Sequence, residues 1–220
     1  MNFKIAKQVI TAAMLCGSLQ ANASAINDAA GDFINGYTGN QAGALDVISA
    51  LVTYNPNTDI FHFESILNGP VTGSGAAYIW GLNRGAGTGR FAANGLPNVL
   101  FDSIVRLNAD GTGAVSLLVP APPATSDLAT GTVKIVGNQI YADIAGSFLP
   151  TQGSDKTAYT WNLWPRDGSV TGFAGISDFA PDNTNAAVQV VPLPTALWLF
   201  SSALGFIILN RKRITGKASC

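Results

Sequence analysis

Short runs of β-branched and aromatic residues alternate with turn-forming residues along most of the chain, with a turn about every ten residues. The most regular run places Phe61 and Phe63 on one face and His62 and Glu64 on the other. Such alternation is typical of a strand with one buried face. Residues 45–54 are predicted to form the preceding strand, so the two runs together predict a β-hairpin.

The same pattern predicts about eight or nine strands in total. We expect them over residues 45–54, 59–67, 76–82, 98–107, 114–119, 130–136, 139–145 and 157–164. The glycine-dense residues 81–95 are expected to form a loop, and the proline-rich residues 120–127 a connector. Because no segment between the two ends has a helical period, the prediction is all-β: a single antiparallel β-sandwich, jelly-roll-like, over residues 26–182. Residues 183–191 are then predicted to be an exit linker.

The N-terminal residues have the pattern of a secretory signal peptide. Lys4 and Lys7 precede an apolar run at 9–19, and small residues follow, with the best cleavage position after Ala25. We therefore expect residues 1–25 to be removed, with the Sec translocon and signal peptidase as partners.

The C-terminal residues form a second apolar segment. It runs from Leu193 to Leu209, and a helix of that length spans about 25 Å at ~1.5 Å per residue. This is slightly less than a hydrocarbon core of about 30 Å, a mismatch that a thinner bilayer absorbs. Residues 192–213 are therefore predicted to form one membrane helix that ends on a basic cluster, with a short tail at 214–220. The basic cluster is Arg211, Lys212 and Arg213.

The order of these C-terminal features resembles the PEP-CTERM sorting signal in its VPLPA-type variant. Val191, Pro192, Leu193 and Pro194 stand at the short proline motif, and the apolar segment and basic cluster follow. The resemblance implies a Gram-negative exporter, an exosortase-type membrane protease that removes the tail, and an inner-membrane-anchored precursor. It further implies a final place on the cell surface or in an exopolysaccharide matrix. An ordinary C-terminal membrane anchor is the alternative.

Four stretches between the two ends resemble the bodies of other proteins that carry this tail. They are residues 78–88, 99–102, 160–168 and 176–183. No activity is associated with that type of body, so the resemblance transfers no catalytic residues.

Charge and cysteine content narrow the choice of function. All thirteen acidic residues but only six of the twelve basic ones lie between the two ends, so this part has a net charge of −7 while the whole chain has −1. An acidic surface argues against nucleic acid as a partner. Cys16 and Cys220 both lie in the terminal segments, which excludes a disulfide or a cysteine-ligated metal in the mature body.

Aspartates provide the candidate metal site. Asp28, Asp32 and Asp46 flank a glycine-rich segment near the start of the body. Loops of this kind can fold around Ca²⁺, which accepts carboxylate and carbonyl oxygens in flexible geometry. The alternative is that these residues only form turns.

Two further sets of residues are candidate ligand contacts. Exposed indole rings stack on the apolar faces of sugars, and closely spaced guanidinium groups bind anions. The tryptophans also suit the core, and the glycines between the arginines also suit a flexible loop. The candidates are Trp80, Trp161 and Trp164 for a sugar, and Arg84 and Arg90 for an anion.

Catalysis has little support in the sequence. His62 and Glu64 share a strand face, but no serine is fixed beside them and no Gly-x-Ser-x-Gly motif occurs. The sequence therefore favours an exported, non-enzymatic protein of the cell envelope or extracellular matrix. A carbohydrate-binding module for exopolysaccharide and a secreted hydrolase are the alternatives.

Overall fold

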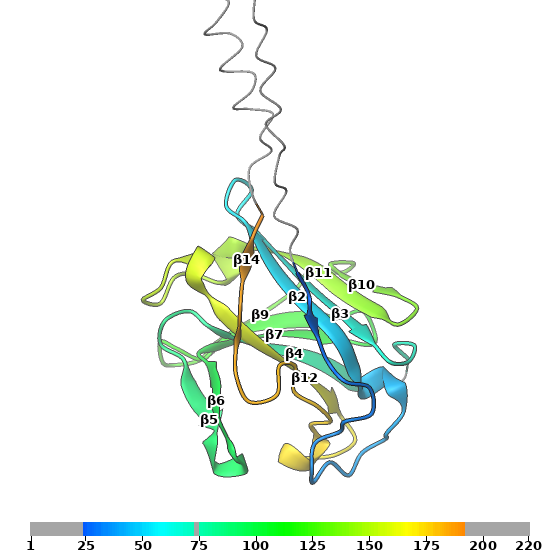
Figure 1. The fold of residues 1–220 in the computed structure, drawn as a ribbon. Coiled ribbons are helices and arrows are strands. Elements are labelled where there is room, and N and C mark those ends of the chain that lie inside the picture. The colour runs from blue at the N-terminus through cyan, green and yellow to red at the C-terminus, as the bar shows by residue number, and fades with distance from the viewer. Residues whose placement is uncertain (1–23, 73–74, 192–220) are drawn as a thin grey trace, which may run out of the picture. The chain divides into compact units, whose positions relative to one another are not determined.

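Two six-stranded sheets dominate the structure, a computed structural model that describes residues 24–72 and 75–191 (Figure 1). The predicted signal peptide, apart from its last two residues, and the predicted C-terminal helix lie outside the described residues. In the first sheet the strand order is β1-β2-β3-β11-β10, and β14 pairs in parallel with β2. Its strands are β1 (Ile26–Asn27), β2 (Val47–Asn55), β3 (Ile60–Leu67), β10 (Val133–Val136), β11 (Gln139–Ala145) and β14 (Gln189–Val190).

The second sheet has the order β13-β12-β4-β7-β8-β9, and all of its pairings are antiparallel. Its strands are β4 (Ala76–Asn83), β7 (Ser103–Asn108), β8 (Gly113–Leu117), β9 (Ala124–Asp127), β12 (Thr160–Asp167) and β13 (Ala186–Ala187). The predicted all-β class with antiparallel sheets is confirmed.

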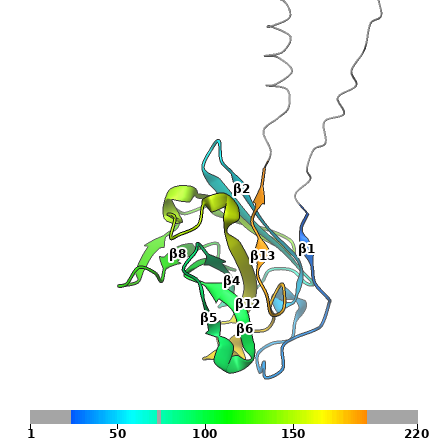
Figure 2. The ribbon, with the colours of Figure 1, turned by 60° about the vertical axis from the view of Figure 1, so that its left-hand side comes forward.

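A separate hairpin of two short strands packs beside β4 and β12 (Figure 2). It consists of β5 (Thr88–Phe91) and β6 (Leu96–Phe101). The prediction that residues 81–95 form a loop is therefore wrong. The described helices are short 3₁₀ turns: η1 (Gly43–Leu45), η2 (Ala92–Asn94), η3 (Gly146–Phe148), η4 (Lys156–Ala158) and η5 (Phe173–Gly175).

The main hydrophobic core lies between the two sheets. Phe61 and Phe63 of β3, which the alternation placed on one face, are fully buried in it together with Trp80 of β4 and Trp161 of β12. The predicted hairpin over residues 45–67 is confirmed as β2–β3. The strands expected at 130–136 and 139–145 correspond to β10 and β11, which pair with each other.

A second hydrophobic cluster covers the opposite face of the second sheet. Trp164 of β12 packs there against Phe101 of β6 and Phe179, with ring centroids 5.0 and 5.9 Å away. Gly81 of β4 accommodates the indole, because a Cβ at this position would lie 2.5 Å from the Trp164 ring. The hairpin and the segment around Phe179 thus cover a sheet face that would otherwise be exposed.

Two predicted elements have a different form in the structure. Residues 98–107 are not one strand, since the chain bends at Asp102 and divides them between β6 and β7. The connector at 120–127 contains β9, whose four residues are exposed. The bend at Asp102 directs its carboxylate into the interior, where it accepts a hydrogen bond from Arg84 Nε.

Residues 183–191 are part of the body and not a linker. They contain β13 and β14, which pair with different sheets, and Val188 between them is buried with its N–H donated to Tyr159 O. Val191, the first residue of the predicted sorting motif, donates its backbone N–H to Tyr54 O at 2.9 Å. Among the described residues, no helix is long and apolar enough to cross a membrane.

Candidate metal centre

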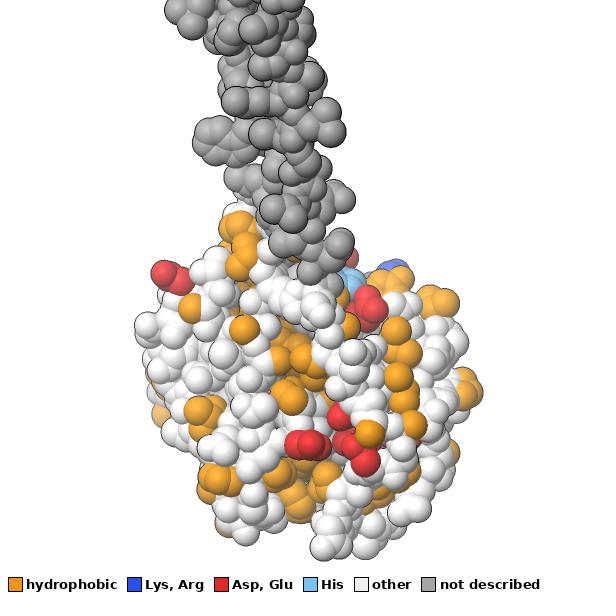
Figure 3. All heavy atoms as spheres, in the orientation of Figure 1, with side chains coloured by type: hydrophobic (Ala, Val, Ile, Leu, Met, Phe, Trp, Pro, Cys, Tyr) orange, Lys and Arg blue, Asp and Glu red, His pale blue; other side chains and the backbone are white. Residues whose placement is uncertain are grey.

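Five aspartates from three separate segments form a cluster near the edges of the two sheets. Figure 3 shows acidic side chains gathered on the face that the N-terminal segment crosses. The aspartates form two groups of three that share one member, and within each group one carboxylate oxygen per residue lies within 4.8 Å of the others. The inner group is Asp32, Asp46 and Asp178, and the outer group is Asp28, Asp32 and Asp182.

Asp46 is the residue between η1 and β2, and it is 1% exposed. Its Oδ2 accepts hydrogen bonds from the Gly31 N–H and from the Asn68 Nδ2, both at 2.8 Å. These bonds hold the N-terminal segment over the start of β2. Its Oδ1 is buried and has no hydrogen-bond partner.

Asp178 lies between η5 and β13 and is also 1% exposed. Its Oδ2 accepts the Val47 N–H at 3.0 Å, and its Oδ1 accepts the N–H of Phe179 at 2.7 Å. Ala180 then forms a bridge to Leu163 of β12. Asp178 therefore connects the first residue of β2 in one sheet to a segment attached to the other sheet.

The outer group is more accessible. Asp28 is half-buried, whereas Asp32 and Asp182 are exposed. One oxygen of Asp28, Oδ2, is nevertheless buried and has no hydrogen-bond partner. The cluster therefore contains two carboxylate oxygens, one in each group, that are withdrawn from water without a donor.

Burial and mutual repulsion raise the pKa of three of these carboxyl groups, those of Asp28, Asp32 and Asp178. Burial, followed by the charges of Asp32 and Asp182, raises the pKa of Asp28 to about 7. Burial is also the main cause that raises the pKa of Asp178 to about 7, and it raises the pKa of Asp32. Without an ion, the cluster is thus an unfavourable place for the negative charges of these three groups.

A hard divalent cation fits the chemistry of this cluster. In residues 24–72 and 75–191, the ion pairs within 4.0 Å involve other acidic residues, so no lysine, arginine or histidine neutralises these five. All the side-chain atoms available to coordinate a metal are carboxylate oxygens, which suit Ca²⁺, Mg²⁺ or Mn²⁺ better than zinc or copper. Ca²⁺ suits it best, because it tolerates irregular geometry and takes six to eight oxygens.

Comparison with protein-family models, with curated protein sequences and with solved structures found no match to this chain. The assignment of the site therefore rests on its own geometry and chemistry.

The three tryptophans do not form a sugar-binding platform. Trp80, Trp161 and Trp164 are 0%, 2% and 3% exposed, so none of them presents a ring face to solvent. Trp161 also donates its Nε1–H to Ala187 O at 3.2 Å. Their role is packing, in the inner core for Trp80 and Trp161 and in the second cluster for Trp164.

The predicted anion site between Arg84 and Arg90 is also wrong. Arg84 is fully buried, and its Nε donates to Asp102 Oδ1 at 2.7 Å. Its two other nitrogens donate to Val119 O at 2.6 Å and to Pro150 O at 2.7 Å. Arg90 instead lies over the Phe101 ring, 5.7 Å from its centroid. The two guanidinium groups thus have separate structural contacts.

His62 is held on both sides by carboxylates on the outer face of the first sheet. Its Nδ1 lies 2.8 Å from Asp143 Oδ1, and its Nε2 lies 3.1 Å from Glu64 Oε2. Burial alone lowers the pKa of His62, but the bonds to Asp143 and Glu64 outweigh it and raise the pKa above its ordinary value. Because both ring nitrogens are engaged, neither is free to activate a nucleophile.

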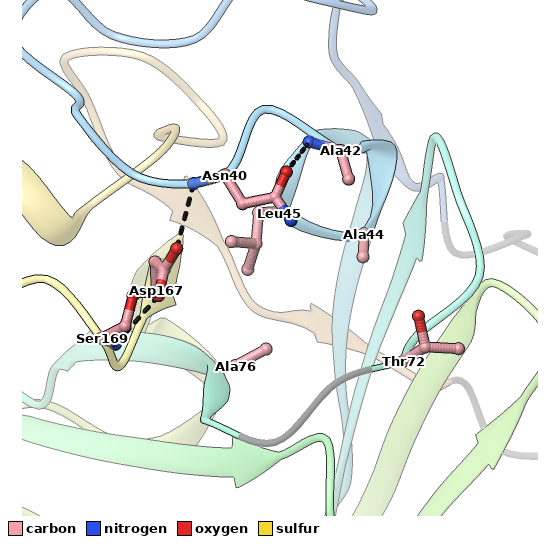
Figure 4. Close-up of a pocket in the computed structure, with 8 residues that line it drawn as sticks. All are labelled: Asn40, Ala42, Ala44, Leu45, Thr72, Ala76, Asp167 and Ser169. Atoms are coloured by element: carbon pink, nitrogen blue, oxygen red, sulfur yellow. Dashed lines mark hydrogen bonds between the residues drawn. The ribbon is translucent and has the colours of Figure 1, made fainter.

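A surface pocket of about 360 Å³ lies beside the end of β12 (Figure 4). Among the described residues that line it, Asp167 alone is charged. Its Oδ2 accepts the Asn40 N–H, and its Oδ1 accepts the N–H and hydroxyl of Ser169. Through these bonds, the Asp167 carboxylate stabilises the turn that follows β12. The pocket is a weaker candidate than the cluster, where carboxylate oxygens lack donors.

The structure brings together the three aspartates predicted from the sequence and adds two more. Asp28, Asp32 and Asp46 all belong to the cluster. Asp178 and Asp182 were missed because they come from the opposite end of the body, and no local spacing links them to the first three. The one available signal was that these two aspartates lie four positions apart at the end of the predicted body.

Proposed function

We propose that this chain is an exported, non-enzymatic protein of a Gram-negative cell envelope or extracellular matrix, and that Ca²⁺ bound at the aspartate cluster stabilises its body. The signal-peptide pattern and the PEP-CTERM-like tail support export. They also support the Sec translocon, signal peptidase and an exosortase-type protease as partners. The tail then directs an inner-membrane-anchored precursor to the surface or to an exopolysaccharide matrix.

One observation carries the calcium proposal. Asp46 is 1% exposed, and its Oδ1 is buried without a hydrogen-bond partner. One oxygen each of Asp32 and Asp178 lies within 4.8 Å of a carboxylate oxygen of Asp46. A buried, unpaired carboxylate oxygen costs several kcal/mol if it stays charged, on the order of the penalty for any desolvated ion. A cation bound by these oxygens compensates for that cost.

The position of the cluster indicates what the cation does. Asp46 precedes β2 of the first sheet, and Asp178 belongs to a segment bridged to β12 of the second. We regard the body as a β-sandwich with jelly-roll-like connections, in which this cation fastens the two sheets at one edge. It would serve the purpose that disulfides serve in other secreted domains, since both cysteines lie in the terminal segments.

Neither alternative function gains support from the placement of its residues. A carbohydrate-binding module needs exposed ring faces, and the three tryptophans are buried. A hydrolase that uses His62 needs a free ring nitrogen, and both nitrogens contact carboxylates. The cluster therefore remains the best candidate for a functional site.

Calorimetric titration tests calcium binding directly. Residues 24–191 lie within one compact unit that contains both hydrophobic clusters, so we expect this fragment to fold and to be suitable for the titration. We expect saturable Ca²⁺ binding, strongly weakened by Asp32→Asn, since Asp32 belongs to both groups and is exposed. Asp127→Asn, an exposed change on β9, should bind as the parent does. Absence of binding by a folded parent would overturn the calcium part of the proposal.

A further inference from the structure

The five aspartates form two groups of three with one shared member, an arrangement that bears on how many cations the cluster binds. Oxygens around a single Ca²⁺ lie 2.3–2.6 Å from it, so any two of them are at most about 5 Å apart. The inner and the outer group each satisfy this condition on their own. Among the described residues, the five together do not form one such group.

Each group contains its own buried carboxylate oxygen without a partner. In the inner group this atom is Oδ1 of Asp46, and in the outer group it is Oδ2 of Asp28. Asp28 is not a member of the inner group, so an ion held there is not bound by its carboxylate. The two atoms are therefore independent indications of two cation positions.

The charge of the cluster leads to the same conclusion. Ligation requires the ionised carboxylates, and five of them carry −5, so one Ca²⁺ leaves −3 and two leave −1. Repulsion between carboxylates this close is severe where burial excludes water, and Asp46 and Asp178 are each 1% exposed. A second cation removes most of the charge that the first one leaves.

We propose that the cluster binds two Ca²⁺ ions, with the Asp32 carboxylate shared between them. This inference rests on the proposed calcium function and adds its stoichiometry. Asp46 and Asp178 hold the inner ion, and Asp28 and Asp182 hold the outer one. The outer ion fastens the segment before β13 to the N-terminal segment, because Asp182 and Asp28 lie in these two segments.

Counting bound ions tests this inference. Residues 24–191 are equilibrated by dialysis in 1 mM CaCl₂ and 150 mM NaCl, and the calcium content per chain is measured by mass spectrometry against the dialysate. We expect two ions for the parent and one for Asp182→Asn, which changes an exposed member of the outer group alone. Asp127→Asn is the matched control and should keep two. Circular dichroism of each sample checks that it is folded.

The possible results separate the two proposals. Two ions in the parent and one in Asp182→Asn support the two-ion site. One ion in the parent contradicts this inference and leaves the proposed function intact. No bound ion contradicts both, and two ions in Asp182→Asn contradict the assignment of the second ion to the outer group.

Discussion

The carboxylate of Asp178 accepts a hydrogen bond from the backbone N–H of Val47 at 3.0 Å, although the two residues are 131 positions apart. Val47 begins β2 and follows Asp46 directly, so this bond brings the two buried aspartates of the cluster together. It also joins a segment near the end of the body to the first long strand, β2.

Replacing Asp178 by alanine should destabilise the body even without a metal. The change leaves the N–H groups of Val47 and Phe179 without their acceptor, and a buried unsatisfied donor costs about 1–3 kcal/mol. We expect a loss of this size in urea unfolding in EDTA. Asp127→Ala, on exposed β9, should change stability by no more than about 0.5 kcal/mol. Equal losses in the two variants would contradict the role assigned to Asp178.

The buried ion pair of Arg84 and Asp102 should be essential for stability. Both side chains are 0% exposed, so Arg84→Met leaves a buried carboxylate without its partner, at a cost of about 3–5 kcal/mol. Urea unfolding measures the loss. Arg106→Gln, an exposed change on the adjacent strand β7, is the control and should be nearly neutral. A loss below about 1 kcal/mol in Arg84→Met would show that the pair contributes little.

The pH dependence of stability should reveal the contacts of His62. Its pKa is raised in the folded state, so its contribution is complete below about pH 6.5 and is lost as the pH rises through the folded pKa. The stability difference between the parent and His62→Gln should therefore shrink from pH 5.5 to 8.5, by up to about 1 kcal/mol. Groups common to both proteins cancel in this difference. A stability difference that stays constant, or grows, with rising pH would contradict the contribution assigned to the contacts of His62.

Export and processing make a separate prediction. In the native host, mass spectrometry of the surface fraction should find a mature protein that begins near Ile26 and lacks residues 201–220. Cleavage after Ala25 leaves β1 (Ile26–Asn27) intact, so the mature protein keeps its pairing with β2. Recovery of the intact apolar tail at the surface would favour a plain membrane anchor.

Local pattern predicted the parts of the fold that depend on neighbours in sequence. Alternation at Phe61 and Phe63 identified the buried face of β3, and short β-branched runs identified the strands β10 and β11. The break at Asp102 was missed because it depends on Arg84, a residue from another strand that pairs with it in the core. From the sequence alone, an aspartate that forms a buried ion pair cannot be distinguished from an exposed one.

The same limit applies to the candidate site. Asp28, Asp32 and Asp46 could be predicted because one short segment contains them, whereas Asp178 and Asp182 join them only through the fold. The tryptophans show the converse: their residue type suggested sugar binding, but the two sheets and the β5–β6 hairpin bury Trp80, Trp161 and Trp164. Exposure, which decides between binding and packing, is a property of the whole chain.

Thermal unfolding of residues 24–191 in EDTA and in millimolar Ca²⁺ tests the central claim most directly. A ligand that binds only the native state adds roughly 2.7 kcal/mol at a hundredfold excess over Kd. For a domain of this size we expect Ca²⁺ to raise Tm by about 5–10 °C, and Asp32→Asn should lose most of this gain. Equal melting temperatures in the two buffers, for a folded parent protein, would contradict a stabilising calcium site.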